Sequence, residues 1–308
     1  MIKMNEEVIA QICIKHFSES PQSIDRCGVG IGNYVYIVEC KNTKYVIRCS
    51  EEINAYDDTR SLLGKLSALD IPIPHVVASG KFLQYEYIIL TYIEGKDIGL
   101  VYQNLSTNEK KKIAKDVVEI QNRVAELDIK NIEENWSWES VVKDILNRAK
   151  EMILKNGYFS IEKIERIQAK MSDFAEYFAN VKPIPYLDDI SSKNLLIYNG
   201  QVSGVIDIDW IGIGDRLTFV ALTKMALLDL EYDTDYITYI LEEMQLCDME
   251  KAVLDFYTLM FCVDFMGERG TKFLDKTVNV DEQIVKRLNQ IYDTLWNDFI
   301  KNCETINL

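Results

Sequence analysis

The first part of the chain contains short runs of β-branched and aromatic residues separated by turn sequences. Such runs occupy 34–38, 45–49 and 85–93, and their length and composition predict strands. Residues 5–17 and 55–69 instead place apolar side chains at helical spacing, and the prolines that follow the second of these segments end it. We therefore predict a strand-rich first part with two accompanying helices.

The rest of the chain follows a helical period, with one interruption. Apolar residues recur at helical spacing in 106–127, 134–154, 161–178, 219–230 and 284–299. The interruption is a pair of short apolar runs, 195–198 and 202–206, on either side of Asn199-Gly200. An Asn-Gly pair between apolar runs predicts a β-hairpin.

Polar side chains gather at the outer ends of this hairpin. Asn194 directly precedes its first strand, Asp207 directly follows its second, and Asp189 lies five residues before Asn194. The outer ends of neighbouring antiparallel strands lie side by side, so we expect Asn194 and Asp207 to meet, with Asp189 on the loop that leads in. Their oxygens suit a hard cation such as Mg²⁺, and one carboxylate remains to orient a hydroxyl.

Composition limits the class of protein. With 308 residues, of which 48% are apolar and 27% charged, the chain is long enough for a large core and two lobes. No apolar run approaches the roughly 20 residues needed to cross a bilayer. The first residues are acidic where a signal peptide is basic, so we expect a cytoplasmic protein with no membrane partner.

Cysteine, histidine and net charge exclude further classes. Seven cysteines at irregular spacing argue against a disulfide framework, and most of them are expected to be buried free thiols. Two histidines exclude a histidine-rich zinc site and argue against a Ser-His-Asp hydrolase, so carboxylates must transfer protons. A net charge of −15 repels nucleic acid and attracts cations, although solubility alone would also explain it.

Three glycines alternate with other residues just before the run at 34–38. Gly28, Gly30 and Gly32, followed by Asn33, allow a backbone to approach phosphates and to point its amides at them. A glycine-rich turn without a ligand is at least as common. The segment is neither a Walker A loop, since no Gly-Lys-Ser or Gly-Lys-Thr follows, nor a Rossmann loop, since a strand follows.

The order Asp-x-x-x-x-Asn, strand, turn, strand, Asp resembles the catalytic segment of kinases. The ending Ile206-Asp207-Ile208-Asp209-Trp210, with Gly214-Asp215 beyond it, is similar to the aminoglycoside phosphotransferase and choline kinase superfamily, most closely its hygromycin phosphotransferase branch. The similarity is densest over 186–221 and weaker over 27–95. It departs at Leu187, where these families usually have a loop-shaping histidine.

This resemblance implies an α+β, protein-kinase-like fold of two lobes. A small β-rich N-lobe, 1–93, would bind nucleotide, and a larger, mostly helical C-lobe, 94–308, would hold the catalytic loop and the acceptor. Such an enzyme would use Mg²⁺ and take phosphate from ATP or GTP. We expect it to work as a monomer or homodimer.

The resemblance also implies roles near the hairpin. Asp189 would be the catalytic base for the acceptor hydroxyl, and Asn194 and Asp207 would hold Mg²⁺ against the phosphates. Asp188 is less suitable as base, because only Asp189 has the five-residue step to Asn194. We expect Asp209 to cap the end of the strand rather than to stand beside a second metal ion.

In the N-lobe the resemblance implies a nucleotide site. Arg48 would bind the α- and β-phosphates and pair with an acid at the start of the next helix, for which Asp58 is preferred and Asp57 is nearly as good. The turn at 28–33 would cover the phosphates. The backbone of Thr91, Tyr92 and Ile93 would hydrogen-bond the adenine ring.

The acceptor is predicted to be a small cationic molecule. Eight acids and no basic residue occur between Asp229 and Glu250. Together with the resemblance, this acidity favours an aminoglycoside or aminocyclitol antibiotic and hence a resistance enzyme. Choline, homoserine or a sugar amine is the nearest rival. A nucleotide-binding pseudoenzyme, suggested by Leu187, and a purely structural helical protein are alternatives of other classes.

Overall fold

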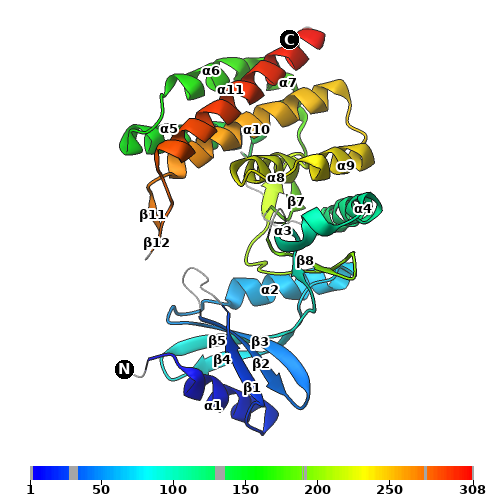
Figure 1. Cartoon of the computed structure of the whole chain (residues 1–308), viewed down its shortest axis with the longest axis vertical. Helices are drawn as coiled ribbons and strands as arrows, with labels where there is room; N and C mark the ends of the chain where they lie inside the picture. Colours follow the sequence, from blue (N-terminus) through cyan, green and yellow to red (C-terminus); the bar gives the residue numbers. More distant parts are fainter. Residues whose placement is uncertain are drawn as a thin grey trace. The chain divides into compact units, whose positions relative to one another are not determined.

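The computed structural model of the chain describes residues 3–27, 34–128, 136–188, 190, 193–273 and 276–306. The chain forms two compact units. Unit 1 comprises Met1–Lys96, Leu196–Tyr198 and Val202–Trp210, and unit 2 comprises Asp97–Leu195, Asn199–Gln201 and Ile211–Leu308. Unit 1 contains an antiparallel sheet and unit 2 is mainly helical, which confirms the predicted α+β class (Figure 1). The predicted lobe limits, 1–93 and 94–308, stay a prediction.

Unit 1 is built on a five-stranded antiparallel sheet with the strand order β1-β2-β3-β5-β4. Its strands are β1 (Ser23–Arg26), β2 (Tyr34–Cys40), β3 (Thr43–Ser50), β4 (Val76–Phe82) and β5 (Tyr85–Thr91). The unit also contains α1 (Glu6–Phe17), α2 (Asp57–Leu66) and the 3-10 turn η1 (Ser67–Leu69). The strand runs and helical segments expected in this part of the chain are thus present.

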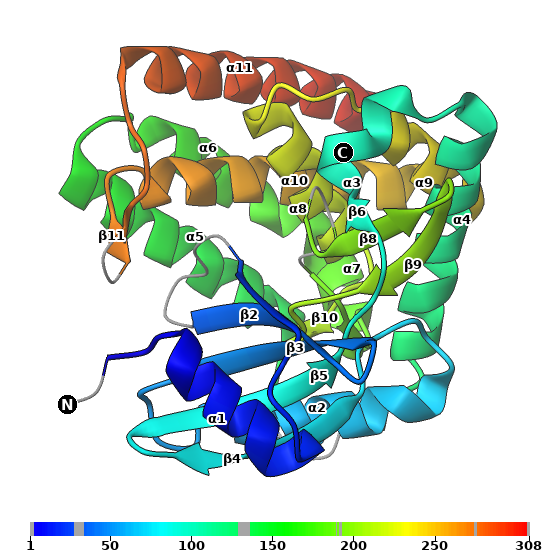
Figure 2. The same ribbon diagram turned by 60° about the horizontal axis from the view of Figure 1, so that its bottom comes forward.

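One face of this sheet is covered by helix α1, and Arg48 lies on the other face. Helix α1 lies across one face, where its Ile9 and Ile12 pack in one core with Ile47 and Cys49 of β3 (Figure 2). Successive side chains of a strand point to opposite faces. Arg48, between Ile47 and Cys49, therefore points to the face away from α1.

The predicted hairpin forms part of a second, three-stranded sheet. Strands β6 (Lys96–Asp97), β8 (Leu195–Tyr198) and β9 (Gln201–Val205) lie in the order β6-β8-β9. At the turn, Asn199 and Gly200 have φ angles of 50° and 72°. Positive φ at both central residues is the geometry of a type I′ turn, which confirms the hairpin expected from the Asn-Gly pair.

Unit 2 is a helical assembly whose most buried element is α10 (Asp248–Glu268). This helix packs against α5 (Trp138–Asn156), α8 (Thr218–Asp229) and α11 (Glu282–Thr305). The remaining helical elements are α3 (Ile98–Val101), η2 (Tyr102–Asn104), α4 (Thr107–Val124), α6 (Glu162–Lys170), η3 (Met171–Phe174), α7 (Ala175–Asn180) and α9 (Asp235–Met244). Two small sheets join β7 (Ile184–Tyr186) to β10 (Gly212–Gly214), and β11 (Lys272–Phe273) to β12 (Lys276–Thr277).

One expected helix differs in detail. The segment 161–178 forms α6, the 3-10 turn η3 and α7 instead of one continuous helix. Met171 and Phe174 in the turn are buried, as are Ile164 and Ile167 of α6, so the spacing of apolar residues continues through the 3-10 turn without marking it.

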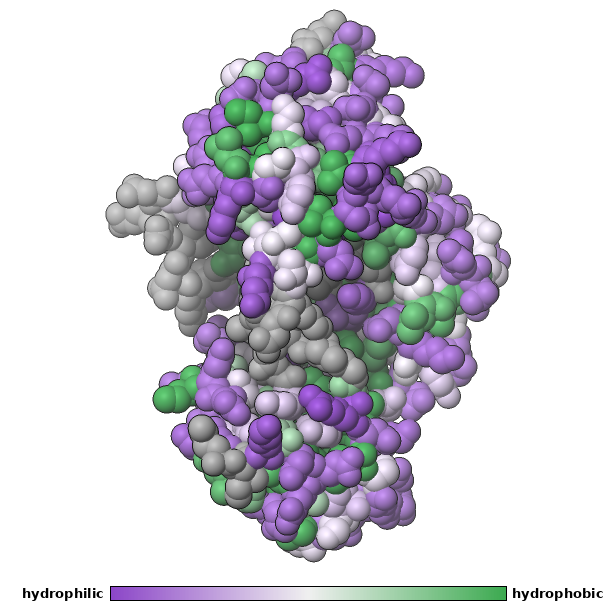
Figure 3. Space-filling model, turned by 60° about the vertical axis from the view of Figure 1, so that its left-hand side comes forward, coloured by the Kyte–Doolittle hydropathy of each residue, from purple (hydrophilic) through white to green (hydrophobic). Residues whose placement is uncertain are grey.

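The surface and the cysteines agree with the composition. Within the described ranges, no helix has the length and apolar character needed to span a bilayer. Hydrophilic side chains cover much of the face seen in Figure 3. All seven cysteines are free, and five of them, Cys13, Cys40, Cys49, Cys262 and Cys303, are buried, as expected.

Candidate functional site

Arg48 of β3 is the centre of a polar cluster within unit 1. Its Nη1 and Nη2 donate to Oδ1 and Oδ2 of Asp209 at 2.9 and 2.6 Å. The hydroxyl of Thr59, on α2, donates to Oδ1 of Asp209 at 2.9 Å, and Oδ1 of Asp207 lies 3.4 Å from Nη1 of Arg48. The guanidinium also lies 5.6 Å from the ring centre of Tyr56. The cluster therefore ties β3 and α2 to the segment that follows β9.

This arrangement corrects the predicted partner of Arg48. The sequence favoured Asp58, with Asp57 as second choice, yet the carboxylate that binds Arg48 is Asp209. Asp58 is exposed, and Asp57 pairs with Arg60 on the same helix. The position on α2 that faces Arg48 and Asp209 is occupied by Thr59, which is buried. Asp209 is thus an ion-pair partner rather than the strand-end cap that we expected.

The pair shifts the pKa of Asp209. Burial raises the pKa of this carboxyl, but the hydrogen bonds and charge of Arg48, together with the Thr59 hydroxyl, outweigh burial and hold the pKa below its ordinary value. Arg48 is only 7% exposed, so its charge depends on Asp209 for compensation.

Asp209→Asn should lower the free energy of unfolding by about 1–3 kcal/mol at pH 7, because a buried guanidinium loses its ionised partner. The folded pKa of Asp209 is depressed, so its stabilisation is full above the unfolded pKa of about 3.9 and is lost as pH falls through the folded value. Urea unfolding of both proteins at several pH values measures the difference. Asp57→Asn is the control, since its pair with Arg60 is exposed and should contribute under about 1 kcal/mol. Equal losses in the two variants would contradict the structural importance of the Asp209 pair.

The two predicted metal ligands share an unusual backbone conformation. Asn194 has φ of 65° and Asp207 has φ of 58°, which is the left-handed region. Asn and Asp tolerate this region better than other non-glycine residues, and such conformations cluster at functional sites. Asn194 directly precedes β8, and Asp207 follows β9 by two residues. An amide oxygen and an exposed carboxylate are each ligands of a kind that Mg²⁺ accepts, since this ion usually binds one or two carboxylates and completes its shell with phosphates and water.

Several predicted residues lie outside the described ranges. These are Asp189, Gly28, Gly30, Gly32 and Asn33. Their assignment as catalytic base and phosphate-covering turn stays a prediction.

The predicted adenine-binding link, Thr91, Tyr92 and Ile93, begins at the last residue of β5. The backbone N–H of Thr91 donates to the C=O of His75 at 2.9 Å, and the Nζ of Lys44 lies 5.4 Å from the ring centre of Tyr92. Ile93 packs against Gly204 of β9, where an added Cβ would come within 2.7 Å of the Ile93 side chain. The link therefore rests on the strand that leads to Asp207, and both belong to unit 1.

The segment leading to Asp189 is held within unit 2. Strand β7 ends at Tyr186 and pairs with β10 up to Gly212. The next residue, Leu187, exchanges two hydrogen bonds with the side chain of Gln121, on α4. Both residues are buried.

The acidic stretch at 229–250 is largely compensated by basic residues outside it. Six of its eight acids form ion pairs with Lys or Arg: Asp229, Glu231, Asp235, Glu242, Asp248 and Glu250. In the described part of the chain, Asp233 and Glu243 are the members of the stretch without an ion pair. The sequence alone therefore overestimates the charge that this stretch offers to a cationic acceptor.

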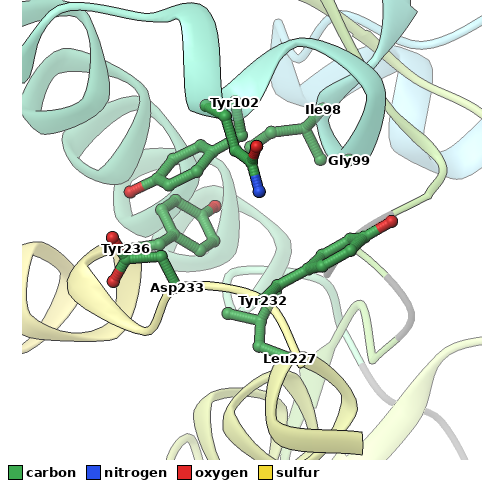
Figure 4. Close-up of a pocket in the computed structure, with 8 residues that line it drawn as sticks. Ile98, Gly99, Tyr102, Leu227, Tyr232, Asp233 and Tyr236 are labelled. Carbon is green, nitrogen blue, oxygen red and sulfur yellow. The ribbon is translucent and has the colours of Figure 1, made fainter. Parts of the chain in front are cut away.

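A small aromatic cavity lies beside this stretch. Tyr102, Tyr232, Tyr236 and Asp233 are among the residues that line it (Figure 4). Its volume of about 20 Å³ is close to the space that one water molecule requires. The lining combines three tyrosines with one carboxylate, that of Asp233, but the cavity is too small to enclose an antibiotic.

Sequence reasoning missed the contacts that Thr59, Gln121 and Asp209 make in these segments. Thr59 and Gln121 stand on helices among many similar polar residues, and no local pattern distinguishes them. Asp209 was noticed, but its partner lies 161 residues earlier, so only the fold reveals the pair.

Comparison with known proteins places this geometry in context. A family model described as the phosphotransferase enzyme family matches residues 23–240. No curated protein matches the chain.

Solved structures of aminoglycoside phosphotransferases share the fold. ADP-bound APH(2'')-Ib is 17% identical with a TM-score of 0.66, over 94% of this chain and 98% of its own. The streptomycin-ATP complex of APH(2'')-IIa is 17% identical with a TM-score of 0.64, over 96% and 97%. The apo form of a thermostable mutant of APH(4)-Ia is 15% identical with a TM-score of 0.63, over 96% and 98%. These similar values do not single out the hygromycin branch.

The family match extends from β1 into α9 and covers more than half of the chain. It includes Arg48, Asn194, Asp207 and Asp209. The prediction of a small-molecule kinase is thereby confirmed at the level of the family: the chain belongs to the phosphotransferase enzyme family.

Proposed function

We propose that this protein transfers the γ-phosphate of ATP or GTP to a hydroxyl of a small cationic molecule. The observation that carries the proposal is the cluster in unit 1, where the basic residue of β3 is tied to Asp207 and Asp209 beyond the hairpin. This is the combination of a phosphate-binding cation and a metal-binding carboxylate that phosphoryl transfer requires.

Arg48 keeps donors for the phosphates while it binds Asp209. A guanidinium carries five N–H donors, of which two bind Asp209. Asp209 and Thr59 hold the side chain in place, so the remaining donors are directed before a nucleotide arrives, which lowers the ordering cost of binding. We assign the α- and β-phosphates to Arg48 and to the turn with Gly28, Gly30, Gly32 and Asn33.

The remaining roles belong to the link and to the ends of the hairpin. Backbone groups of Thr91, Tyr92 and Ile93 hydrogen-bond the nucleotide base. Asn194 and Asp207 hold Mg²⁺, which when bound neutralises charge on the phosphates. Asp189 accepts the proton of the acceptor hydroxyl and orients its oxygen for attack.

The leading acceptor is an aminoglycoside or aminocyclitol antibiotic, which would make this a resistance enzyme. Relatives of the same fold are known with streptomycin, gentamicin or hygromycin B bound. The net charge of −15 also favours a cationic substrate. Choline, homoserine or a sugar amine remains the alternative, because compensation of the 229–250 acids weakens the case for a polycation. We place the enzyme in the cytoplasm, where ATP and GTP are available, as a monomer or homodimer.

Nucleotide diphosphate release in the presence of Mg²⁺ tests this function. The panel contains streptomycin, gentamicin, hygromycin B, choline, homoserine and galactosamine, each with ATP and with GTP. We expect turnover with at least one antibiotic and a product heavier by one phosphate in mass spectrometry. Binding of Mg·ADP without turnover of any acceptor would favour the pseudoenzyme, and absence of nucleotide binding would refute the kinase function altogether.

A further inference from the structure

Gln121 of α4 binds the chain two residues before Asp189. Its Oε1 accepts from the backbone N–H of Leu187 at 2.9 Å, and its Nε2 donates to the backbone C=O of Leu187 at 2.5 Å. Gln121 is 6% exposed and Leu187 is 3% exposed. One side-chain amide therefore satisfies both backbone groups of a single buried residue.

The contact between Gln121 and Leu187 lies where strand β7 ends. The backbone ladder between β7 and β10 ends at Tyr186, so Leu187 is the first residue beyond it. Buried backbone groups need hydrogen-bond partners. The side chain of Gln121 binds the backbone N–H and C=O of Leu187 in place of a residue on a neighbouring strand. It fixes the peptide groups on both sides of Leu187 as the chain leaves the strand.

The chemistry of glutamine fits this task. A primary amide presents one acceptor and one donor side by side on a planar group. Glutamate has the same length but lacks the donor when ionised, and methionine has a similar shape with neither strong group. The side chain of Gln121 also borders a cavity of about 120 Å³ next to Pro185 and Tyr186, so these substitutions have room.

We infer that Gln121 is a positioning residue for the predicted base: its two hydrogen bonds to Leu187 fix the backbone two residues before Asp189. The inference rests on the proposed phosphotransfer function, because Asp189 is the group that is positioned.

Gln121→Met should lower kcat by about 100-fold, because a displacement of about 1 Å at a reacting group costs a factor of that order. The KM values for nucleotide and acceptor should change by less than about threefold, since Gln121 is buried and the proposal assigns it to neither ligand. Asn122→Leu is the matched control on the same helix turn, with an exposed side chain and an expected kcat near that of the wild type. An unchanged kcat in Gln121→Met would overturn the inference.

Gln121→Glu gives a readout that loss of folding would not produce. A protonated carboxyl offers an O–H donor and a C=O acceptor, so it reproduces the amide, whereas the ionised form repels the C=O of Leu187. Burial raises the pKa of such a carboxyl. The ratio of variant to wild-type kcat should therefore rise as the pH falls, while the ratio for Gln121→Met stays flat. A flat ratio for Gln121→Glu would contradict the donor role.

Hydrogen exchange separates this inference from the proposed function. The Leu187 amide should exchange slowly in the wild type and in Asn122→Leu, and at least about 10-fold faster in Gln121→Met, as measured by mass spectrometry on peptides that cover 184–188. If the wild type turned over no acceptor, the proposed function would fail. The two hydrogen bonds between Gln121 and Leu187 would then be tested by this exchange alone. Equal exchange in all three proteins would overturn it.

Discussion

Asp189→Asn should reduce acceptor-dependent ADP release by about 100-fold to 10,000-fold, the range that general-base catalysis contributes. Asparagine has nearly the same shape but cannot accept the hydroxyl proton. The affinity for Mg·ADP should stay within about twofold, because Asp189 is assigned to the acceptor and not to the nucleotide. Initial rates and calorimetric titration with ADP measure the two quantities.

Asp188→Asn is the natural control for this substitution. The two carboxylates are adjacent in sequence, so any effect of lost charge on the loop is shared, while only Asp189 has the five-residue step to Asn194. We expect Asp188→Asn to keep kcat within about threefold of the wild type. A loss in Asp188→Asn as large as that in Asp189→Asn would move the base to position 188 or assign both residues to the fold.

Asp207→Asn should also reduce turnover by about 100-fold or more, because a charged ligand that stabilises the phosphates is lost. Asparagine adopts the left-handed conformation that Asp207 occupies, and the Asp207 side chain is 58% exposed. Stability should therefore change by less than about 0.5 kcal/mol. The Mg²⁺ concentration at half-maximal rate should rise, which a titration of rate against Mg²⁺ would show.

Asp209→Asn and Asp207→Asn should differ in their effects on stability and on the Mg²⁺ requirement. Asp209 binds Arg48 through two hydrogen bonds, whereas Asp207 lies 3.4 Å from the same guanidinium. We therefore expect the larger loss of stability at position 209 and the larger change in Mg²⁺ requirement at position 207. An unchanged Mg²⁺ requirement in Asp207→Asn would remove this residue from the metal site.

Much of the fold could be predicted because its signals are local. Asn199-Gly200 specifies its turn through backbone conformations that these two residues tolerate, and the structure has that turn. Ser106 and Glu109 form the capping box that their spacing indicates at the start of α4. The one expected helix that is broken, 161–178, has a helical period throughout, so the pattern of apolar residues does not reveal the 3-10 turn at Met171–Phe174.

For the candidate site, the sequence suggested which residue types take part but did not reveal which residue binds Arg48. The spacing of Asn194 and Asp207 around a hairpin indicated the chemistry, and their left-handed backbone conformations agree with a specialised role. The partner of Arg48 was placed on α2 by position, where an acid would complement the helix dipole in any case. Local spacing cannot distinguish such an acid from one contributed by a distant segment.

The sequence by itself determined the class of fold and the hairpin, because each depends on residues a few positions apart and on the period of apolar side chains. Only the tertiary structure decided that Asp209 binds Arg48 and that Gln121 binds Leu187, across 161 and 66 residues of chain. The physical reason is that a buried charge or backbone group accepts whichever partner the packing brings within hydrogen-bond distance. That choice depends on how strands and helices pack together and leaves no periodic pattern in the sequence.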